Sequence, residues 1–191
     1  MFAKLVSSFS AAMFTKSFMS LSAAKKIAYL SVFTAIAVVI NTISIDVTPS
    51  FKLSFTATVG FIGGCFFGPV GGFSVMLIGD VIGGFLAGFV PNPIITVGTC
   101  MFGLVPGIIV PYCKWNLGVK VVVSFLICAV VATMGLNAYG TYLFAGNKYT
   151  SYWAYLLIAR VPQLAVTFAN AFISFFAAKL LNRSGIRFKI S

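Results

Sequence analysis

A succession of long apolar stretches, separated by short polar connections, is the feature that most constrains the fold of this chain. A membrane-spanning helix needs roughly 20 apolar residues, and lipid admits only helices or closed barrels because backbone polar groups must be satisfied internally. The apolar stretches lack the two-residue alternation of barrel strands, so they predict helices. We expect an all-α membrane protein, a bundle of six transmembrane helices at about 25–45, 54–67, 70–90, 94–112, 121–144 and 152–181.

The composition supports this class of protein and leaves no room for a soluble domain. Hydrophobic residues make up 60% of the chain and charged residues only 8%, whereas soluble domains average about 25% charged residues. We expect two parts, an N-terminal segment at residues 1–22 and a six-helix domain at residues 23–191. In the segment, Phe2, Phe9 and Phe18 belong to a near-helical apolar pattern with lysines between its members. This pattern predicts a short helix on the inner membrane surface, with disorder as the alternative.

The distribution of basic residues predicts the orientation of the bundle. The chain has 13 lysines and arginines against 2 acidic residues. An even number of spans places both termini and the loop 114–120 on one side, and most of the basic residues fall there. Cytoplasmic loops accumulate Lys and Arg, so we expect cytoplasmic termini in a multi-pass protein of the cell membrane. The positive charge therefore reflects topology, and we expect no nucleic-acid partner.

The residue types that usually carry catalysis or bind metals are largely missing. The chain has no histidine, and its cysteines lie in or beside apolar stretches without CxxC spacing. We interpret Cys65, Cys100, Cys113 and Cys128 as small apolar side chains, and we expect no metal site and no cofactor. The sequence has no GxxxxGK[ST] loop for ATP, no carboxylate pair and no Ser/His/Asp set, so we do not expect an enzyme.

Two charged residues fall inside predicted helices and need a physical reason to be there. Asp80 lies within the glycine-rich stretch 68–107, and Arg160 lies a similar distance into the last predicted helix. A charge inside lipid costs several kcal/mol unless it has a partner or faces a cavity. Two interpretations remain open: Asp80 and Arg160 pair with each other, or both line a cavity that receives a polar solute from outside.

A polar stripe on the last predicted helix favours the cavity. Residues spaced three or four apart share one face of a helix, and four polar residues follow this spacing: Arg160, Gln163, Thr167 and Asn170. Pro162 removes a backbone donor in the same region and can kink the helix. The fourth predicted helix adds Thr96 and Thr99. Tyrosines at the start of the sixth, including Tyr155, fit either a membrane-interface belt or stacking on a flat ring.

These features together resemble a known family. The short chain with six spans, the glycine-rich third and fourth helices, and two small residues four apart on the first helix, Ser31 and Ala35, are similar to S components. S components are the substrate-binding membrane subunits of energy-coupling factor (ECF) vitamin importers. The runs KLSF at 52–55, FGPVGG at 67–72 and GD at 79–80, with the Arg160-centred last helix, resemble the folate-specific members in particular.

The resemblance implies a function and a set of partners. Such a subunit binds its vitamin from outside with high affinity, capped by loops that include residues 52–55. It then topples in the membrane when docked on a T component that is driven by two cytoplasmic ATPases. ATP is used by these partners and not by this chain. Ser31 and Ala35 would form the docking face, and the family implies a prokaryotic source.

Folate chemistry gives the candidate residues roles, as a hypothesis within this resemblance. The pterin edge presents N–H donors side by side, and the buried carboxylate of Asp80 can accept them. The carboxylates of the glutamate tail would prefer the cations of Lys52, Lys148 or Arg160, while aromatic rings enclose the flat middle of the molecule. The expected substrate-binding residues are Asp80, Arg160, Lys52, Phe55, Thr99, Tyr155, Gln163 and Asn170.

Other substrates and other classes of protein remain as alternatives. Within the family these substrates are riboflavin, thiamin, hydroxymethylpyrimidine and a queuosine precursor. From another class, the chain would be a stand-alone carrier or channel that works without partner subunits. A membrane enzyme is the most distant alternative. Co-purification with a T component and ATPases distinguishes an S component from a channel.

Overall fold

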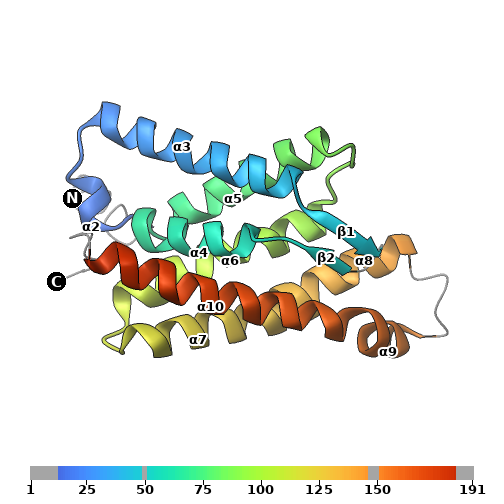
Figure 1. The fold of residues 1–191 in the computed structure, drawn as a ribbon. Helices are drawn as coiled ribbons and strands as arrows, with labels where there is room; N and C mark the ends of the chain where they lie inside the picture. Colours follow the sequence, from blue (N-terminus) through green and yellow to red (C-terminus); the bar gives the residue numbers. More distant parts are fainter. Residues whose placement is uncertain (1–12, 49–50, 146–150, 184–191) are drawn as a thin grey trace, which may run out of the picture.

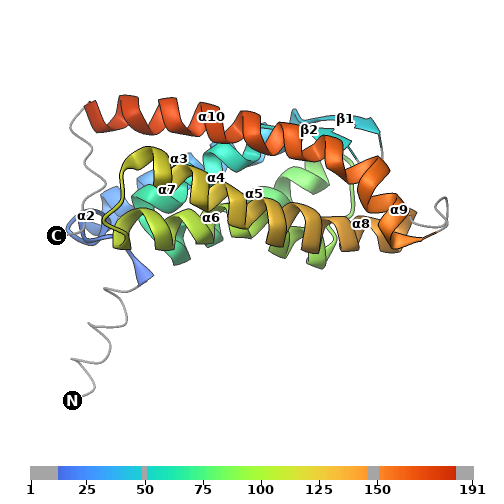
Figure 2. The ribbon, with the colours of Figure 1, turned by 90° about the horizontal axis from the view of Figure 1, so that it is seen from below.

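The structure is a bundle of antiparallel helices with one small β-hairpin at one end (Figures 1 and 2). It is a computed structural model that describes residues 13–48, 51–145 and 151–183. Segments η1 and η3 are π-helical, and each continues the α-helix that precedes it. The elements in chain order are α2 (Lys16–Met19), α3 (Ala23–Thr42), β1 (Ile45–Thr48), β2 (Phe51–Leu53), α4 (Thr56–Phe67), α5 (Pro69–Leu86), α6 (Pro93–Tyr112), α7 (Leu117–Cys128), η1 (Ala129–Asn137), α8 (Ala138–Ala145), α9 (Tyr152–Tyr155), η3 (Leu156–Arg160) and α10 (Val161–Arg183).

The helices agree closely with the predicted spans. Five helical stretches within the described residues are long and apolar enough to cross a membrane: Ala23–Thr42, Pro69–Leu86, Pro93–Tyr112, Leu117–Phe144 and Tyr152–Arg183. The remaining predicted span is α4, which has 12 residues. At 1.5 Å per residue it reaches about 18 Å, against a hydrocarbon core of about 30 Å. The predicted helical bundle is confirmed, whereas six complete crossings stay a prediction.

Glycine and proline set the boundaries between α4, α5 and α6. Gly68 ends α4 with a φ of 92°, which glycine adopts without steric cost, and Pro69 follows as the first residue of α5. α6 begins at Pro93, and the side chain of Asn92 caps it by accepting a hydrogen bond from the Ile94 N–H at 3.0 Å. These residues determine where the chain reverses at the two ends of the bundle.

The backbones of α4, α5 and α6 approach one another closely because glycines face one another where the helices cross. A Cβ added to Gly64 would lie 2.3 Å from the carbonyl oxygen of Gly103, and a Cβ added to Gly72 would lie 2.6 Å from the same atom. Small residues allow membrane helices to pack at such short range. The glycine-rich stretch of the sequence therefore forms the central contact of the bundle.

Replacing Gly64 with alanine should destabilise the protein by about 1–3 kcal/mol. The added Cβ would overlap the carbonyl oxygen of Gly103, a backbone atom, so α4 and α6 would have to move apart. Gly63 provides a matched control on the same helix, since a Cβ there would meet nothing closer than 3.9 Å. Thermal unfolding of the purified variants measures the difference. Equal melting temperatures for Gly64→Ala and Gly63→Ala would contradict the proposed close contact.

α3 packs along α5 through a strip of small residues, and its Phe33 also contacts Phe66 and Phe67 on α4. A Cβ at Gly79 would lie 2.6 Å from the Cβ of Ala37, and one at Gly83 would lie 2.8 Å from the Cβ of Asn41. Only 6% of the most apolar window of α3 is buried, compared with 28–50% in the other four long helices. Most of the surface of α3 is therefore available to lipid or to another protein.

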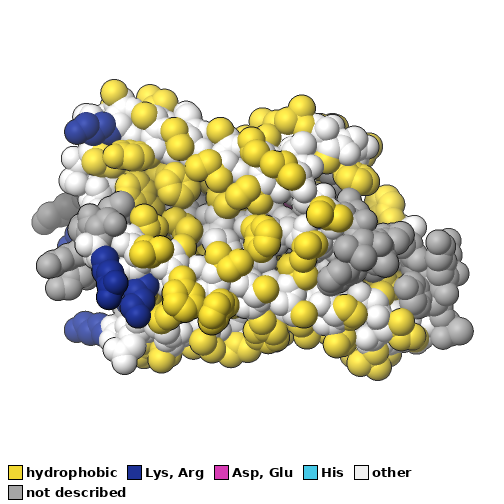
Figure 3. Space-filling model, viewed as in Figure 1, with side chains coloured by type: hydrophobic (Ala, Val, Ile, Leu, Met, Phe, Trp, Pro, Cys, Tyr) yellow, Lys and Arg dark blue, Asp and Glu magenta, His cyan; other side chains and the backbone are white. Residues whose placement is uncertain are grey.

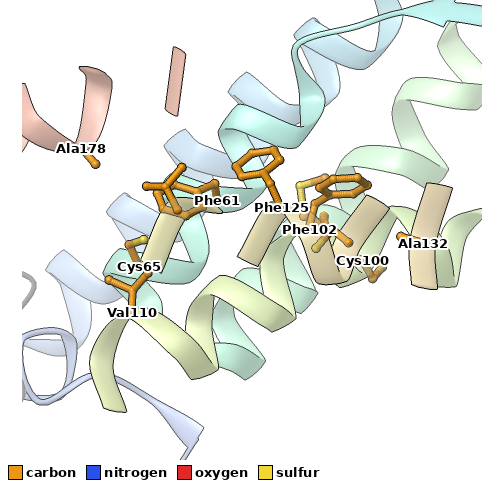
Figure 4. Packing of buried hydrophobic residues seen from close by; sticks show 11 residues of the cluster. Phe61, Cys65, Cys100, Phe102, Val110, Phe125, Ala132 and Ala178 are labelled. Atoms are coloured by element: carbon orange, nitrogen blue, oxygen red, sulfur yellow. The ribbon is translucent and has the colours of Figure 1, made fainter. Parts of the chain in front are cut away.

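A second layer of packing, formed by apolar side chains, lies between α4, α6 and α7 (Figure 4). Phe61 stacks on Phe125 with ring centroids 5.6 Å apart. The cysteines Cys65, Cys100 and Cys128 are buried in the same cluster as free thiols. For these three the predicted role as small apolar side chains is confirmed, whereas Cys113 is a half-buried free thiol outside the cluster.

The connection between α3 and α4 is a β-hairpin, which corrects the expectation of an all-α fold with an irregular polar connection there. β1 and β2 pair antiparallel, with Ile45 opposite Leu53 and Asp46 opposite Lys52. Isoleucine, valine, threonine and phenylalanine favour strands, but segments of four and three residues are too short to show a periodic pattern. An isolated two-stranded hairpin is marginally stable, so its position depends on contacts with the helices.

Basic side chains gather at the end of the bundle where α3 begins and α10 ends (Figure 3). The predicted N-terminal helix is present there in part, as α2, while residues 1–12 lie outside the described residues. Its Phe18 is buried against Phe67 at the end of α4, so α2 packs on the bundle. The side of the membrane on which this end lies stays a prediction.

Candidate ligand-binding site

Asp80 presents a carboxylate near the end of the bundle that carries the hairpin. It lies on α5 and is half-buried, and the buried Thr96 on α6 donates a hydrogen bond to its Oδ2 at 2.7 Å. No side chain in the described part of the chain donates a hydrogen bond to Oδ1. Thr99 is half-buried and donates to the carbonyl of Ile95 at 3.0 Å. Asp80 thus keeps an acceptor for a ligand, whereas the hydroxyl of Thr99 is bound to its own helix.

Arg160 is buried, with 7% of its surface exposed, and it does not pair with Asp80. Its Nε donates to the hydroxyl of Tyr155 at 2.8 Å, and its Nη2 donates to the carbonyl of Asn137 at 2.8 Å and to the hydroxyl of Thr141. Among the described residues, no carboxylate lies within ion-pair distance of this guanidinium, and Nη1 makes no hydrogen bond. A buried cation with free donors favours a negatively charged ligand.

Two π-helical segments hold Arg160 in place. η3 ends at Arg160, and η1 ends at Asn137, whose carbonyl receives the Nη2 bond. Pro162 cannot donate to the carbonyl of Ile158, so the regular hydrogen-bond ladder is interrupted at η3, and the chain changes direction between α9 and α10 (Figure 2). Such π-helical turns occur frequently at functional sites.

Lys52 on β2 brings a second cation to the same end of the molecule. Its Nζ donates to Oδ1 of Asn41 at 3.4 Å and lies 5.9 Å from the ring centroid of Phe89. Asn41 in turn donates from Nδ2 to the backbone carbonyl of Asp80 at 3.3 Å. Lys52 therefore lies two hydrogen bonds away from the residue that carries the carboxylate. Asp46 is the cross-strand neighbour of Lys52 in the hairpin.

Gln163 and Asn170 on α10 contact the connection between α3 and α4. The side-chain amide of Gln163 exchanges two hydrogen bonds of 2.9 Å with the backbone of Lys52. Asn170 is 1% exposed, donates to the carbonyl of Ser54 at 2.9 Å and accepts from the N–H and hydroxyl of Thr58. Of the predicted polar stripe, Gln163 and Asn170 therefore contact this connection, whereas the hydroxyl of Thr167 lies 3.3 Å from that of Thr133 on η1.

Polar contacts thus run through every helix that surrounds the hairpin end. Gln163 joins α10 to β2, and Asn41 joins α3 to β2. Arg160 joins η3 to η1 and α8. Thr96 joins α6 to α5. The cations of Lys52 and Arg160 and the carboxylate of Asp80 belong to this set. Within the described residues, no group of three or more potential metal ligands occurs.

The aromatic residues of the expected site differ in what they can offer. Phe55 is 48% exposed at the start of α4. Tyr155 is fully buried, packs against Tyr142 at 5.4 Å between ring centroids, and places its hydroxyl on Arg160. Phe55 therefore has a free ring face for stacking, whereas Tyr155 orients the arginine.

Several residues of this set were not predicted. Asn41 had a weak signal, a lone amide near the end of an apolar helix, and Asn137 and Thr141 had none that separates them from other polar residues of the fifth span. Their contribution depends on π-helical geometry and on long-range packing, neither of which leaves a local pattern. Ser31 and Ala35, the residues predicted to form a docking face, are both exposed on α3.

These polar residues lie at one end of a bundle of long apolar helices, and comparisons with known proteins identify the class of the protein. A model of the family "ECF transporter, substrate-specific component" matches residues 25–179. The crystal structure of FolT bound with folic acid is similar, with a TM-score of 0.62 and 25% sequence identity over 81% of this chain and 90% of that chain. No curated protein sequence shows a significant match.

The family match covers most of the chain, which therefore belongs to the ECF transporter substrate-specific components. The resemblance inferred from the sequence is confirmed. Members of this family are integral membrane proteins that bind substrates for transport, and the fold is that of a transporter component and not of an enzyme.

Proposed function

We propose that this protein is the folate-binding S component of an ECF importer in a prokaryotic cell membrane. The observation that carries the proposal is the charge arrangement at the hairpin end, where the cations of Lys52 and Arg160 lie with the carboxylate of Asp80, and where Arg160 and Asp80 do not pair with each other. Folate carries two carboxylates on its glutamate tail and a row of N–H donors on its pterin. The similar FolT structure with bound folic acid supports the same assignment.

Each of these charged groups has a matching part of the ligand in this proposal. The free Oδ1 of Asp80 accepts from the pterin N–H groups, while Thr96 holds Oδ2. Arg160 and Lys52 bind the tail carboxylates, since charge-assisted hydrogen bonds are the strongest available there. Lys148, the third cation expected for the tail, lies outside the described residues. Phe55 stacks on the flat middle of the molecule.

Transport requires partners that act on the exposed side of α3. We propose that a T component docks on the face that contains Ser31 and Ala35, and that two cytoplasmic ATPases drive it. The small size and exposure of both residues support this assignment. The chain itself uses no cofactor in this proposal, and its basic end lies in the cytoplasm.

Titration of the purified protein with folic acid, riboflavin and thiamin tests the proposed substrate. We expect folic acid alone to bind saturably, with one molecule per chain, as measured by calorimetry. Saturable binding of riboflavin or thiamin, with none of folic acid, would overturn the proposal. Solute flux through the purified chain alone in liposomes would instead indicate a carrier or channel.

The role of Lys52 can be separated from general effects on the site. Lys52→Met removes the cation but keeps an apolar stem, so binding of folic acid should weaken by about tenfold. Pteroic acid has the same pterin but lacks the glutamate tail, so its affinity should change little. An equal loss for both ligands would show that Lys52 does not bind the tail.

A further inference from the structure

The side chain of Gln163 replaces a strand at the open edge of the β-hairpin. In a strand, the N–H and C=O of one residue point to the same edge. Both groups of Lys52 point to Gln163, with Oε1 accepting and Nε2 donating at 2.9 Å each. The amide of glutamine has the same donor and acceptor as a peptide group, so it satisfies an edge that would otherwise be left without partners.

Asn170 repeats this arrangement further along α10. It lies seven residues after Gln163, two turns on the same face of the helix. Its Nδ2 donates to Ser54 O at 2.9 Å, and its Oδ1 accepts from Thr58 N at 3.2 Å. The connection is therefore held on α10 at both ends of the stretch 52–58.

We propose that Gln163 and Asn170 are positioning residues that fasten the stretch 52–58, which we call the lid, onto α10 and so control how fast the ligand leaves. This inference rests on the proposed function for its ligand and goes beyond it in assigning two residues of α10 to the control of release. Lys52 and Phe55, the groups that would contact the ligand, belong to the fastened segment. Arg160 lies three residues before Gln163, so the ligand-binding cation and the lid fastener share one helix.

The chemistry of the contact explains why an amide is present at position 163. A carboxylate could accept from the Lys52 N–H but would repel its carbonyl, and a lysine could donate but not accept. Only asparagine and glutamine among side chains offer a neutral donor and acceptor side by side, and only glutamine has the length used here. The amides of α10 therefore match the backbone of the lid and not a charged group of the ligand.

Hydrogen exchange in the ligand-free protein tests the fastening directly. Gln163→Met keeps the length of the side chain but removes both hydrogen bonds, and we expect the amide of Lys52 to exchange about tenfold faster. Gln163→Glu keeps an acceptor for that amide and should give a smaller increase. Asn182→Ala, which removes an exposed amide at the other end of α10, is the control and should leave the lid unchanged.

Dissociation of the bound vitamin supplies the second measurement. We expect Gln163→Met to raise the dissociation rate about tenfold and to change the association rate less, for every ligand that the protein binds. Unchanged exchange at Lys52 would overturn the fastening, and faster exchange with an unchanged dissociation rate would overturn its control of release. A faster dissociation rate confined to ligands that share one chemical group would show that Gln163 contacts the ligand instead. If folic acid does not bind at all, the proposed substrate fails while the exchange experiment still decides the fastening.

Discussion

Replacing Asp80 with asparagine is expected to weaken folate binding about 100-fold, the largest effect of any single substitution in the site. In the proposed site the carboxylate offers Oδ1 to the pterin, while Thr96 occupies Oδ2 at 2.7 Å. An asparagine that keeps the bond from Thr96 turns its NH₂ group toward the N–H donors of the pterin. Hydrogen bonds to a charged group contribute about 1.5–3 kcal/mol, and the variant also places two donors face to face. Calorimetric titration of the purified variant with folic acid measures the loss.

The fold should survive this substitution, because asparagine has the same shape and the backbone carbonyl of residue 80 keeps its bond from Asn41. Thermal unfolding in the absence of ligand provides the control and should give a melting temperature close to that of the unaltered protein. Folate affinity equal to that of the unaltered protein would show that Asp80 does not face the pterin.

A tryptophan at Ala35 is expected to abolish vitamin uptake by the assembled importer while leaving vitamin binding unchanged. Ala35 is exposed on α3, the least buried of the long helices, so the larger ring points away from the bundle. Close approach of two membrane helices depends on small residues at their interface, and an indole there separates the backbones. Uptake of radiolabelled folate into liposomes that contain the full complex, with ATP inside, measures transport.

Val122→Trp is the matched control for this experiment, since Val122 is 55% exposed on α7, away from α3. It places the same ring on the lipid-facing surface and should leave uptake intact. Normal uptake by Ala35→Trp would show that the docking face does not lie on this side of α3. Loss of uptake in both variants would point to a general effect of the added ring.

The helices of this protein could be predicted from its sequence because their signals are local. Long apolar stretches, the positive φ that Gly68 supplies before Pro69, and Asn92 before Pro93 each set an element or boundary within a few residues. The two intramembrane charges were recognisable for the same reason, since a single Asp80 or Arg160 in an apolar stretch needs no structural context to be unusual.

The contacts between distant residues could not be predicted in this way. The sequence left open whether Asp80 and Arg160 pair, and the answer depends on Asn137 and Thr141, whose groups reach Arg160 through a π-helical segment. The polar stripe was visible, but nothing local indicated that Gln163 would bind the backbone of a residue 111 positions earlier. The hairpin was missed because its strands are too short to show periodicity.

The substrate itself is the central claim, and mass spectrometry of the small molecules released from the purified, denatured protein tests it most directly. High-affinity ligands survive purification, and their mass identifies them without assuming a binding mode. We predict the mass of a folate, in an amount close to one molecule per chain. Release of riboflavin, thiamin or another vitamin in that amount, with no folate, would contradict the account.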